Sequence, residues 1–547
     1  MSANVISAEL LAKMFLAGAK YLENKKEYVN ELNVFPVPDG DTGTNMTLTI
    51  LSAAKELNAL TETNMATVCK AVSGGSLRGA RGNSGVILSQ LIRGFTKVAS
   101  NYDELTIEIL DEAAQRAVKT AYKAVMSPKE GTILTVASGI GKKAEELHAA
   151  GCTDLNEYLK SILDEAERVL ATTPDLLPVL KEAGVVDSGG QGLVEILRGA
   201  YDAFCGKEID LTFGTGSGKK KEKEPVKEEL KFAYSEEFNL ILDRNFNIKN
   251  EMDFKDYLES IGDSVNVVTE NDVVAVSLNT NDPGLPLQKG LKYGDLNKIR
   301  ITNLKLKDDA SESAAKTPDP VQKPAGPKKK YGFIAVSVGQ GINEIFTSLG
   351  VDYIISGGQT MNPSTEDMLN AIENVNADTI FILPNNKNII MAANQARDLT
   401  KDKQIIVIPT KTIPQGITAV ISFMEDAEAE DNESGMNDGI SAVKTGQVTY
   451  AVRDTVIDNH EIHQDDFMGI GDHGILSVGT DRDVVTLDMI KELADEDTGL
   501  ISVYYGEDVS EKEAGLLRAS LEESFPTTDI EVQYGGQPVY YYIVSVE

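Results

Sequence analysis

The 547-residue sequence predicts a multidomain protein with an all-α amino-terminal domain, a small α+β middle domain and an α/β carboxy-terminal domain with a parallel sheet. A chain of this length is too long for one hydrophobic core. The stretches 209–231 and 307–330 are rich in charged residues, and the hydrophobic period is helical before the first and alternates between strand and helix after the second. We therefore expect domains at 1–208, 232–306 and 331–547, joined by linkers.

The amino-terminal domain is expected to be a bundle or barrel of helices. Apolar side chains recur at helical spacing in residues 10–18 and again after Gly85, where Val86, Ile87 and Leu91 fall on one face. Alternating runs of β-branched residues, which would indicate strands, are scarce here. The pattern favours a single all-α domain.

The stretch 33–46, Asn-Val-Phe-Pro-Val-Pro-Asp-Gly-Asp-Thr-Gly-Thr-Asn-Met, combines a turn with the start of a helix. Asp39 and Asp41 flank Gly40, so the turn can direct both carboxylates to one point, as a Mg²⁺ site requires. The helix expected after Gly43 would present free backbone N–H groups there, which favour an anion. A metal and an anion at one place indicate the phosphate tail of a nucleotide. The simpler alternative is an Asp-Gly turn that only caps a helix.

Two further glycine-rich corners precede helices in this domain, at 73–85 and 185–192. Backbone without side chains lets phosphate oxygens approach closely, and the following helix offers free N–H donors. Arg78 and Arg81 lie in the first corner, where they could neutralise phosphoryl charge. A surface position is the alternative for at least one of them.

The motif at 38–46 resembles the ATP-binding motif of the dihydroxyacetone-kinase L-subunit family, and the whole chain resembles the A subunit of bacterial fatty acid kinase. The resemblance implies ATP, two Mg²⁺ ions, and Asp39 and Asp41 as metal ligands, with Asn33 nearest to the position of the family's third aspartate. Asparagine can offer a carbonyl oxygen but brings no charge. The implied catalytic residues are Asp39, Asp41 and Arg81. The implied ATP-binding residues are Thr42, Gly43, Thr44, Asn45, Met46, Gly82, Asn83, Ser84, Gly85, Thr132 and Asp187.

The middle domain is expected to hold strands near 238–242, 265–268 and 273–276 and a helix near 252–261. The resemblance to the fatty acid kinase A subunit continues here through Asp-Pro-Gly-Leu at 282–285.

Family members often carry a cysteine and two histidines in this domain, a set that suits a metal site. Ser235, Ser277 and Asn279 stand at those positions in this chain. We therefore expect no zinc in the middle domain, and a structural or dimerising role that makes the protein a homodimer.

The carboxy-terminal domain shows short apolar runs at 333–338, 353–355, 379–383 and 404–408, separated by helical stretches. This alternation predicts βαβ units and a parallel sheet, at whose carboxyl edge ligands or partners bind. The loop 357–364, Gly-Gly-Gln-Thr-Met-Asn-Pro-Ser, resembles DegV-type fatty-acid-binding proteins and the carboxy-terminal domain of the kinase A subunit. The resemblance implies a domain that docks a partner.

Composition excludes several classes of function. Eighty-five acidic against 52 basic residues give a net charge of −33, which argues against binding nucleic acid or anionic lipid. The three cysteines, Cys69, Cys152 and Cys205, are too far apart for a disulfide framework or a Cys-x-x-Cys metal site, which fits a reducing cytosol. We see no signal peptide and no apolar run of the ~18 residues that a membrane span needs, and expect a cytoplasmic protein.

Residues and resemblance together predict an ATP-dependent kinase subunit. The resemblance supplies the acceptor, the carboxylate of a fatty acid carried by a separate fatty-acid-binding B subunit of the DegV family, and the product, an acyl phosphate for phospholipid synthesis. A carboxylate is a nucleophile at pH 7, so catalysis reduces to positioning and charge neutralisation. Two alternatives stay open: a dihydroxyacetone-type kinase subunit, and a non-catalytic ATP-binding scaffold.

Overall fold

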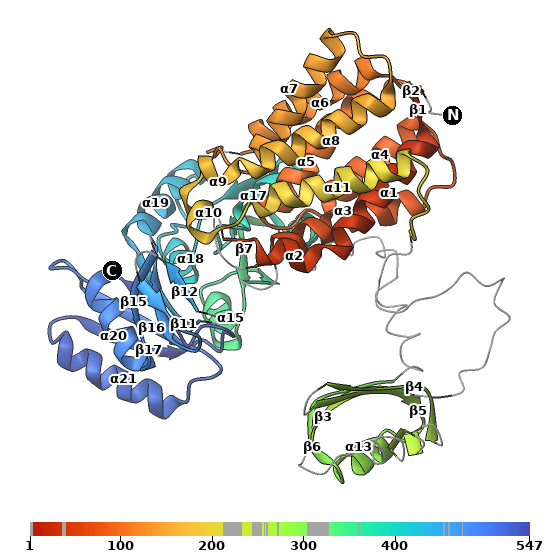
Figure 1. Cartoon of the computed structure of the whole chain (residues 1–547). Coiled ribbons are helices and arrows are strands. Elements are labelled where there is room, and N and C mark those ends of the chain that lie inside the picture. The colour runs from red at the N-terminus through yellow and green to blue at the C-terminus, as the bar shows by residue number, and fades with distance from the viewer. Residues whose placement is uncertain are drawn as a thin grey trace. The chain divides into compact units, whose positions relative to one another are not determined.

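The computed structural model describes residues 4–34, 40–125, 127–211, 232, 234–242, 254–255, 257–258, 261–270, 273–303, 328–358, 362–451, 454–457, 460–472 and 474–547 (Figure 1). The chain forms two compact units. One unit joins residues 1–215 to 323–547, and the other comprises 216–322. The amino-terminal and carboxy-terminal parts therefore pack as one body, whereas the domain boundaries expected from the sequence stay a prediction.

The amino-terminal part is helical, which confirms the predicted fold class of this domain. Long helices lie side by side in Figure 1, and the short strands β1 (Ile6–Ser7) and β2 (Glu104–Leu105) pair antiparallel beside them. The helices are α1 (Ala8–Asn24), α2 (Lys26–Glu31), α3 (Thr42–Asn58), α4 (Met65–Arg78), α5 (Gly82–Ala99), α6 (Ile107–Ala124), α7 (Ile133–Ala149), α8 (Leu155–Ala171), α9 (Thr173–Leu176), α10 (Pro178–Ala183) and α11 (Ser188–Phe204).

Local sequence fixes where several of these helices begin. Asn64 accepts a hydrogen bond from the Thr67 backbone N–H while the Thr67 hydroxyl accepts one from the Asn64 N–H, a capping box that starts α4. Asp154 caps α8 through the backbone N–H groups of residues 156 and 157. The apolar faces that follow these caps meet in a core that includes Val68, Val72, Tyr158 and Ile162.

The carboxy-terminal part begins with a parallel sheet, as predicted. The described strands have the order β10-β9-β7-β8. Successive residues of β7 face opposite sides of the sheet. Phe333 packs in one core with Phe346 and Phe381, and Ile334 lies in a separate core with Met368. The elements are β7 (Lys329–Ser337), α15 (Gln340–Ser348), β8 (Tyr353–Ser356), α16 (Thr365–Asn374), β9 (Ala377–Leu383), α17 (Ile390–Leu399), β10 (Gln404–Val407), α18 (Ile413–Ile421) and α19 (Ala429–Ala442).

A second sheet completes this part, and it is mixed. Its described strands have the order β15-β14-β11-β18-β16-β17, in which β16 and β17 are parallel and the other pairs are antiparallel. The elements are β11 (Lys444–Tyr450), the hairpin β12 (Thr455–Ile457) and β13 (His460–Ile462), β14 (Phe467–Gly471), β15 (Gly474–Gly479), α20 (Arg482–Leu493), β16 (Leu500–Tyr505), α21 (Glu511–Ser524), β17 (Asp529–Tyr534) and β18 (Tyr542–Val546).

The middle unit holds an antiparallel sheet whose described strands have the order β4-β5-β3-β6. Ser235 lies opposite Asn279, so two of the three residues that replace the metal ligands implied by the resemblance are neighbours across this sheet. Half of the helix expected near 252–261 falls outside the described residues, and the described residues 254–255, 257–258 and 261 are helical. The described elements are β3 (Tyr234–Leu242), β4 (Gly262–Glu270), β5 (Val273–Thr280), α13 (Gly284–Gly290) and β6 (Gly294–Asn303).

Within the described residues, no helix is both long enough and apolar enough to cross a bilayer.

Close packing of α3 and α4 gives the first prediction. A Cβ added at Gly75 would lie 2.6 Å from the Ala53 Cα, so a side chain there must push the two helices apart. Gly75→Ala is therefore expected to destabilise the protein by about 1–3 kcal/mol in a thermal or urea unfolding experiment.

The neighbouring Gly74→Ala is the matched control. A Cβ at Gly74 would meet only the end of the Arg78 side chain, at 3.4 Å, and the Glu56 carboxylate. This substitution should leave the protein as stable as wild type or more so, because alanine is the better helix former. Equal effects of the two variants would contradict this account of the packing.

Candidate functional site

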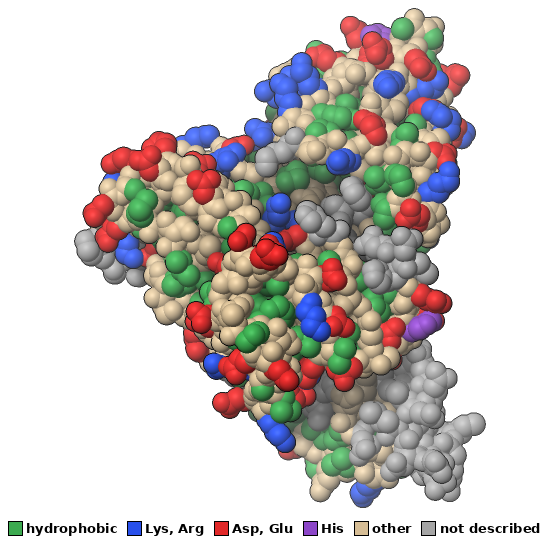
Figure 2. Space-filling model, turned by 90° about the vertical axis from the view of Figure 1, so that its left-hand side faces the viewer, with side chains coloured by type: hydrophobic (Ala, Val, Ile, Leu, Met, Phe, Trp, Pro, Cys, Tyr) green, Lys and Arg blue, Asp and Glu red, His purple; other side chains and the backbone are tan. Residues whose placement is uncertain are grey.

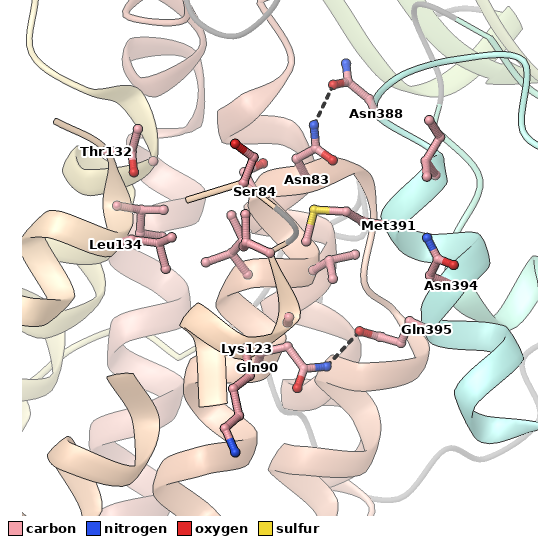
Figure 3. A pocket seen from close by; sticks show the side chains of 18 of the residues that line it. Asn83, Ser84, Gln90, Lys123, Thr132, Leu134, Asn388, Met391, Asn394 and Gln395 are labelled. Atoms are coloured by element: carbon pink, nitrogen blue, oxygen red, sulfur yellow. Dashed lines mark hydrogen bonds between the residues drawn. The ribbon is translucent and has the colours of Figure 1, made fainter. Parts of the chain in front are cut away.

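A cavity of about 1070 Å³ lies where four of the described helices begin. Thr42 opens α3, Asn83 and Ser84 lie in the first turn of α5, Thr132 precedes α7, and Ser188 opens α11; all of them line the cavity (Figure 3). Helix starts carry partial positive charge and favour anions. At α3 the Thr42 and Thr44 N–H groups already donate to Asn33 and Asn30, so the helix dipole rather than free donors acts there. Several helix starts along one cavity suit a group with several negative charges.

Asp41 brings a carboxylate to the same place. It precedes α3 as the N-cap residue and lines the cavity. One carboxylate oxygen, Oδ2, accepts a hydrogen bond of 2.5 Å from the Asn362 side chain. A carboxylate beside an anion site is the arrangement that holds Mg²⁺ between protein and phosphate oxygens. Asp39, the second predicted metal ligand, lies outside the described residues.

Asn33, expected as a third metal ligand, is buried and lines the cavity. Its Oδ1 accepts a hydrogen bond of 3.1 Å from the Thr42 backbone N–H and another from the Thr42 hydroxyl. The oxygen that would bind a cation therefore also holds the first turn of α3. Its role as a ligand stays a prediction.

Several residues of the motif pack against other parts of the protein and do not line the cavity. Thr44 exchanges hydrogen bonds with the Asn30 carboxamide, of 3.0 Å from its N–H and 3.1 Å to its hydroxyl. Gly43 packs so closely on α2 that an added Cβ would lie 2.1 Å from the Lys26 carbonyl oxygen. Met46 is fully buried in the helical core. These residues fix the start of α3, whereas Asn45 lines the cavity as expected.

The corner before α5 brings that helix next to α3. Gly82 has a φ of +56°, in the left-handed region that favours glycine. A Cβ at Gly85 would lie 2.3 Å from the Thr49 hydroxyl oxygen. Neither glycine is among the residues that line the cavity, so their contribution is the close approach of the two helices.

Arg81 is not among the residues that line the cavity either. Its Nη1 donates a hydrogen bond of 2.7 Å to the Asn362 carbonyl oxygen, and its Nη2 lies 3.6 Å from the Asp367 carboxylate. The guanidinium group, predicted as catalytic, therefore connects the helical part to the α/β part. Arg78 pairs with Glu56 at the surface.

Asp187 and Thr132 line the same cavity, at the starts of α11 and α7. Asp187 caps α11 by accepting a hydrogen bond of 2.7 Å from the Gly190 N–H. Burial raises the pKa of its carboxyl to about 6, although backbone N–H groups of Gly190 and Ile133 act in the other direction. The Thr132 hydroxyl donates to the Lys129 carbonyl oxygen.

One wall of the cavity comes from the α/β part and was not predicted. Asn388, Met391 and Asn394 lie across from α5 in Figure 3, and the Asn83 side chain donates a hydrogen bond of 3.0 Å to Asn388 Oδ1. Below them the Gln90 side chain donates to Gln395 Oε1, at 2.9 Å. No local sequence signal marks these residues, because they lie about 300 positions from their partners.

A row of cations on α5 and α6 was also missed. Figure 2 shows lysine and arginine side chains in blue on the upper, helical part of the molecule. Their spacing of three or four residues, which places them on one helix face, was the available signal. The cavity-lining cations of these two helices are Arg93, Lys97, Arg116, Lys119 and Lys123.

Together these features bring to one cavity helix N-termini that suit phosphates, a carboxylate that suits a cation, and apolar side chains such as Leu134 and Ile87. The chain belongs to the FakA-like family, which is named after the A subunit of fatty acid kinase. Residues 332–547 match the family's carboxy-terminal domain, 231–311 its middle domain, and 36–202 the DAK2 domain.

Relatives match over the whole chain. Protein YloV of Bacillus subtilis (strain 168) is 42% identical over 556 residues, with 100% of both chains covered. An uncharacterized protein of Staphylococcus aureus (strain USA300) is 40% identical, with 99% of each chain covered.

Solved structures are more distant. A dihydroxyacetone kinase from C. freundii in complex with AMP-PNP and Mg²⁺ is 18% identical, with 36% of this chain and 34% of that chain covered and a TM-score of 0.29. The fatty acid kinase (Fak) B3 protein of Streptococcus pneumoniae, loaded with linoleic acid, is 12% identical, with 40% and 99% covered and a TM-score of 0.27. Family membership therefore rests on the sequence matches.

The buried Asp187 carboxyl predicts a pH dependence of stability. Its pKa of about 6 in the folded protein exceeds the ordinary value of 3.8, so the folded state keeps a proton that the unfolded chain releases. The free energy of unfolding should therefore fall as pH rises from about 4 to 6 and level off above that, by on the order of 3 kcal/mol for this group.

Asp187→Asn removes the titrating group and keeps an oxygen for the Gly190 N–H. Thermal melts at pH 4 and pH 7 should show the variant gaining stability over wild type at the higher pH only. Asp175→Asn, at an exposed position paired with Lys181, serves as control and should keep the wild-type difference. A wild-type pH profile in Asp187→Asn would refute this assignment.

Proposed function

We propose that this chain is the ATP-dependent kinase subunit that phosphorylates the carboxylate of a fatty acid carried by a separate fatty-acid-binding protein. The observation that supports it most is the convergence of the starts of α3, α5, α7 and α11 with Asp41 on one cavity. The family of the chain supplies the choice of a fatty acid.

The nucleotide would lie along the cavity. The N-termini of α3 and α5, with Thr42, Asn45 and Ser84, would hold the phosphates, and the apolar side chains near Thr132 and Leu134 would hold the base. Asp41 and Asp39 would hold Mg²⁺, which neutralises phosphate charge when bound. The hydrogen bonds that fix Thr42 and Thr44 keep the start of α3 rigid before the nucleotide arrives.

The acceptor needs no base from this chain. A fatty-acid carboxylate is already ionised at pH 7, and one of its oxygens attacks the γ-phosphorus while the bond to the β–γ bridging oxygen breaks, which yields acyl phosphate and ADP. The work left to the protein is alignment and charge neutralisation. The cations of α5 and α6 line the same cavity and would attract an anionic acceptor.

The remaining parts of the proposal concern partners. The acceptor would arrive on a lipid-loaded B subunit of the DegV family that docks on the α/β part, two chains would associate through the middle domain, and the acyl phosphate would enter phospholipid synthesis in the cytoplasm. Two Mg²⁺ ions would serve the site.

Turnover of ATP tests the proposal. Wild-type protein with Mg²⁺ and a lipid-loaded fatty-acid-binding protein is expected to release ADP. Asp41→Ala should lower that rate by at least about 100-fold, because it removes the carboxylate that would bind the cation. Substituting a residue that only hydrogen-bonds to a metal ligand can already lower activity by up to about 100-fold. Asp497→Ala, at an exposed position on the far part of the chain, is the control and should turn over at the wild-type rate.

The alternatives give different results. A scaffold would bind ATP with no turnover on any loaded carrier, and a dihydroxyacetone-type kinase would turn over with the triose and ignore the lipid. Either result would overturn the fatty acid proposal.

A further inference from the structure

A short segment of the α/β part lies against the proposed phosphate and metal site. The Thr365 backbone N–H donates a hydrogen bond of 3.1 Å to the Ala80 carbonyl oxygen, and Ser364 forms an antiparallel bridge with Arg81. Thr365 and Ser364 are at most 3% exposed. The segment is therefore buried and hydrogen-bonded to the backbone of the corner that precedes α5.

Within this segment Asn362 makes two contacts to predicted site residues. Its side-chain Nδ2 donates a hydrogen bond of 2.5 Å to Asp41 Oδ2, and its carbonyl oxygen accepts one of 2.7 Å from Arg81 Nη1. Asn362 is 2% exposed, so water does not compete for either bond. A residue 321 positions along the chain therefore holds the carboxylate that would bind the cation.

The side chain of Asn362 also has an acceptor left over. Among the described residues its Oδ1 is buried with no hydrogen-bond partner. A buried carbonyl oxygen without a donor is unfavourable, and such groups mark places where a water or ligand completes the network. A water bound to a cation at Asp41 would be such a donor.

We propose that Asn362 is a positioning residue of the kinase site, which orients the Asp41 carboxylate for Mg²⁺ and thereby makes the α/β part a component of the site. The inference rests on the proposed function, because it takes Asp41 as a metal ligand. The hydrogen bond fixes the rotation of the carboxylate, as outer-shell partners of metal ligands do. Arg81 contributes by holding the Asn362 backbone in place.

The competing explanation is that Asn362 only joins the two parts. Gln395 offers the matched comparison, because it is a buried amide in the same interface whose described hydrogen bonds go to residues other than Asp41. It accepts from Gln90 and donates to the Leu77 carbonyl oxygen and the Thr365 hydroxyl. Loss of Gln395 loosens the interface without releasing the carboxylate.

The test is calorimetric binding of ADP to the full chain at a series of Mg²⁺ concentrations. Asn362→Ala is expected to raise the Mg²⁺ concentration for half-maximal ADP affinity by about 10–100-fold, while the circular dichroism spectrum stays that of wild type. Gln395→Ala should lower the melting temperature and raise the Mg²⁺ requirement much less than Asn362→Ala does, because Gln395 also lines the cavity but its described hydrogen bonds do not include Asp41. A similar shift in both variants, or in neither, would overturn the inference.

Failure of the proposed function and failure of the inference about Asn362 give different results. Wild type without Mg²⁺-dependent ADP binding would show that the proposed function itself fails, whereas normal wild-type binding with an unshifted Asn362→Ala removes only this inference. If Asn362→Ala does not fold, Asn362→Leu nearly keeps the volume and lacks the donor. Its Mg²⁺ requirement for ADP binding should rise as expected for Asn362→Ala, and a wild-type requirement would contradict the proposal.

Discussion

The structure depends on several helix N-termini that open onto one cavity. The starts of α3, α5, α7 and α11 carry positive partial charges that repel one another unless an anion neutralises them. Tight packing must therefore hold these helices in place. Glycines at close approaches, capping side chains and the buried Asn33 amide provide that restraint. The cavity is therefore organised before any ligand arrives, which lowers the ordering cost of binding.

Charge distribution complements this geometry. The chain carries a net charge of −33, yet Arg93, Lys97, Lys119 and Lys123 line the cavity. A cationic wall within an acidic protein focuses the local field on anions and disfavours non-specific binding of nucleic acid elsewhere on the surface. The same field would serve a nucleotide and an ionised acceptor.

Sequence patterns predicted the parts of the fold that depend on neighbouring residues. Helical periodicity and the scarcity of β-branched runs predicted the helical domain, and alternating strand and helix runs predicted the parallel sheet. The motif around Asp41 pointed to the cavity. The contacts between Asp41 and Asn362 and between Asn83 and Asn388 were beyond prediction, because periodicity reports which face of a helix is buried but not which distant surface covers it. The contact of Arg81 with the α/β part was likewise not predicted, and its catalytic role stays a prediction.

The measurement that tests the central claim most directly is the position of a divalent cation in a crystal of the full chain grown with Mn²⁺ and a non-hydrolysable ATP analogue. The account predicts anomalous scattering about 2.2 Å from an Asp41 carboxylate oxygen, with the phosphates at the N-termini of α3 and α5. Manganese bound elsewhere, with phosphates away from these helix starts, would contradict it.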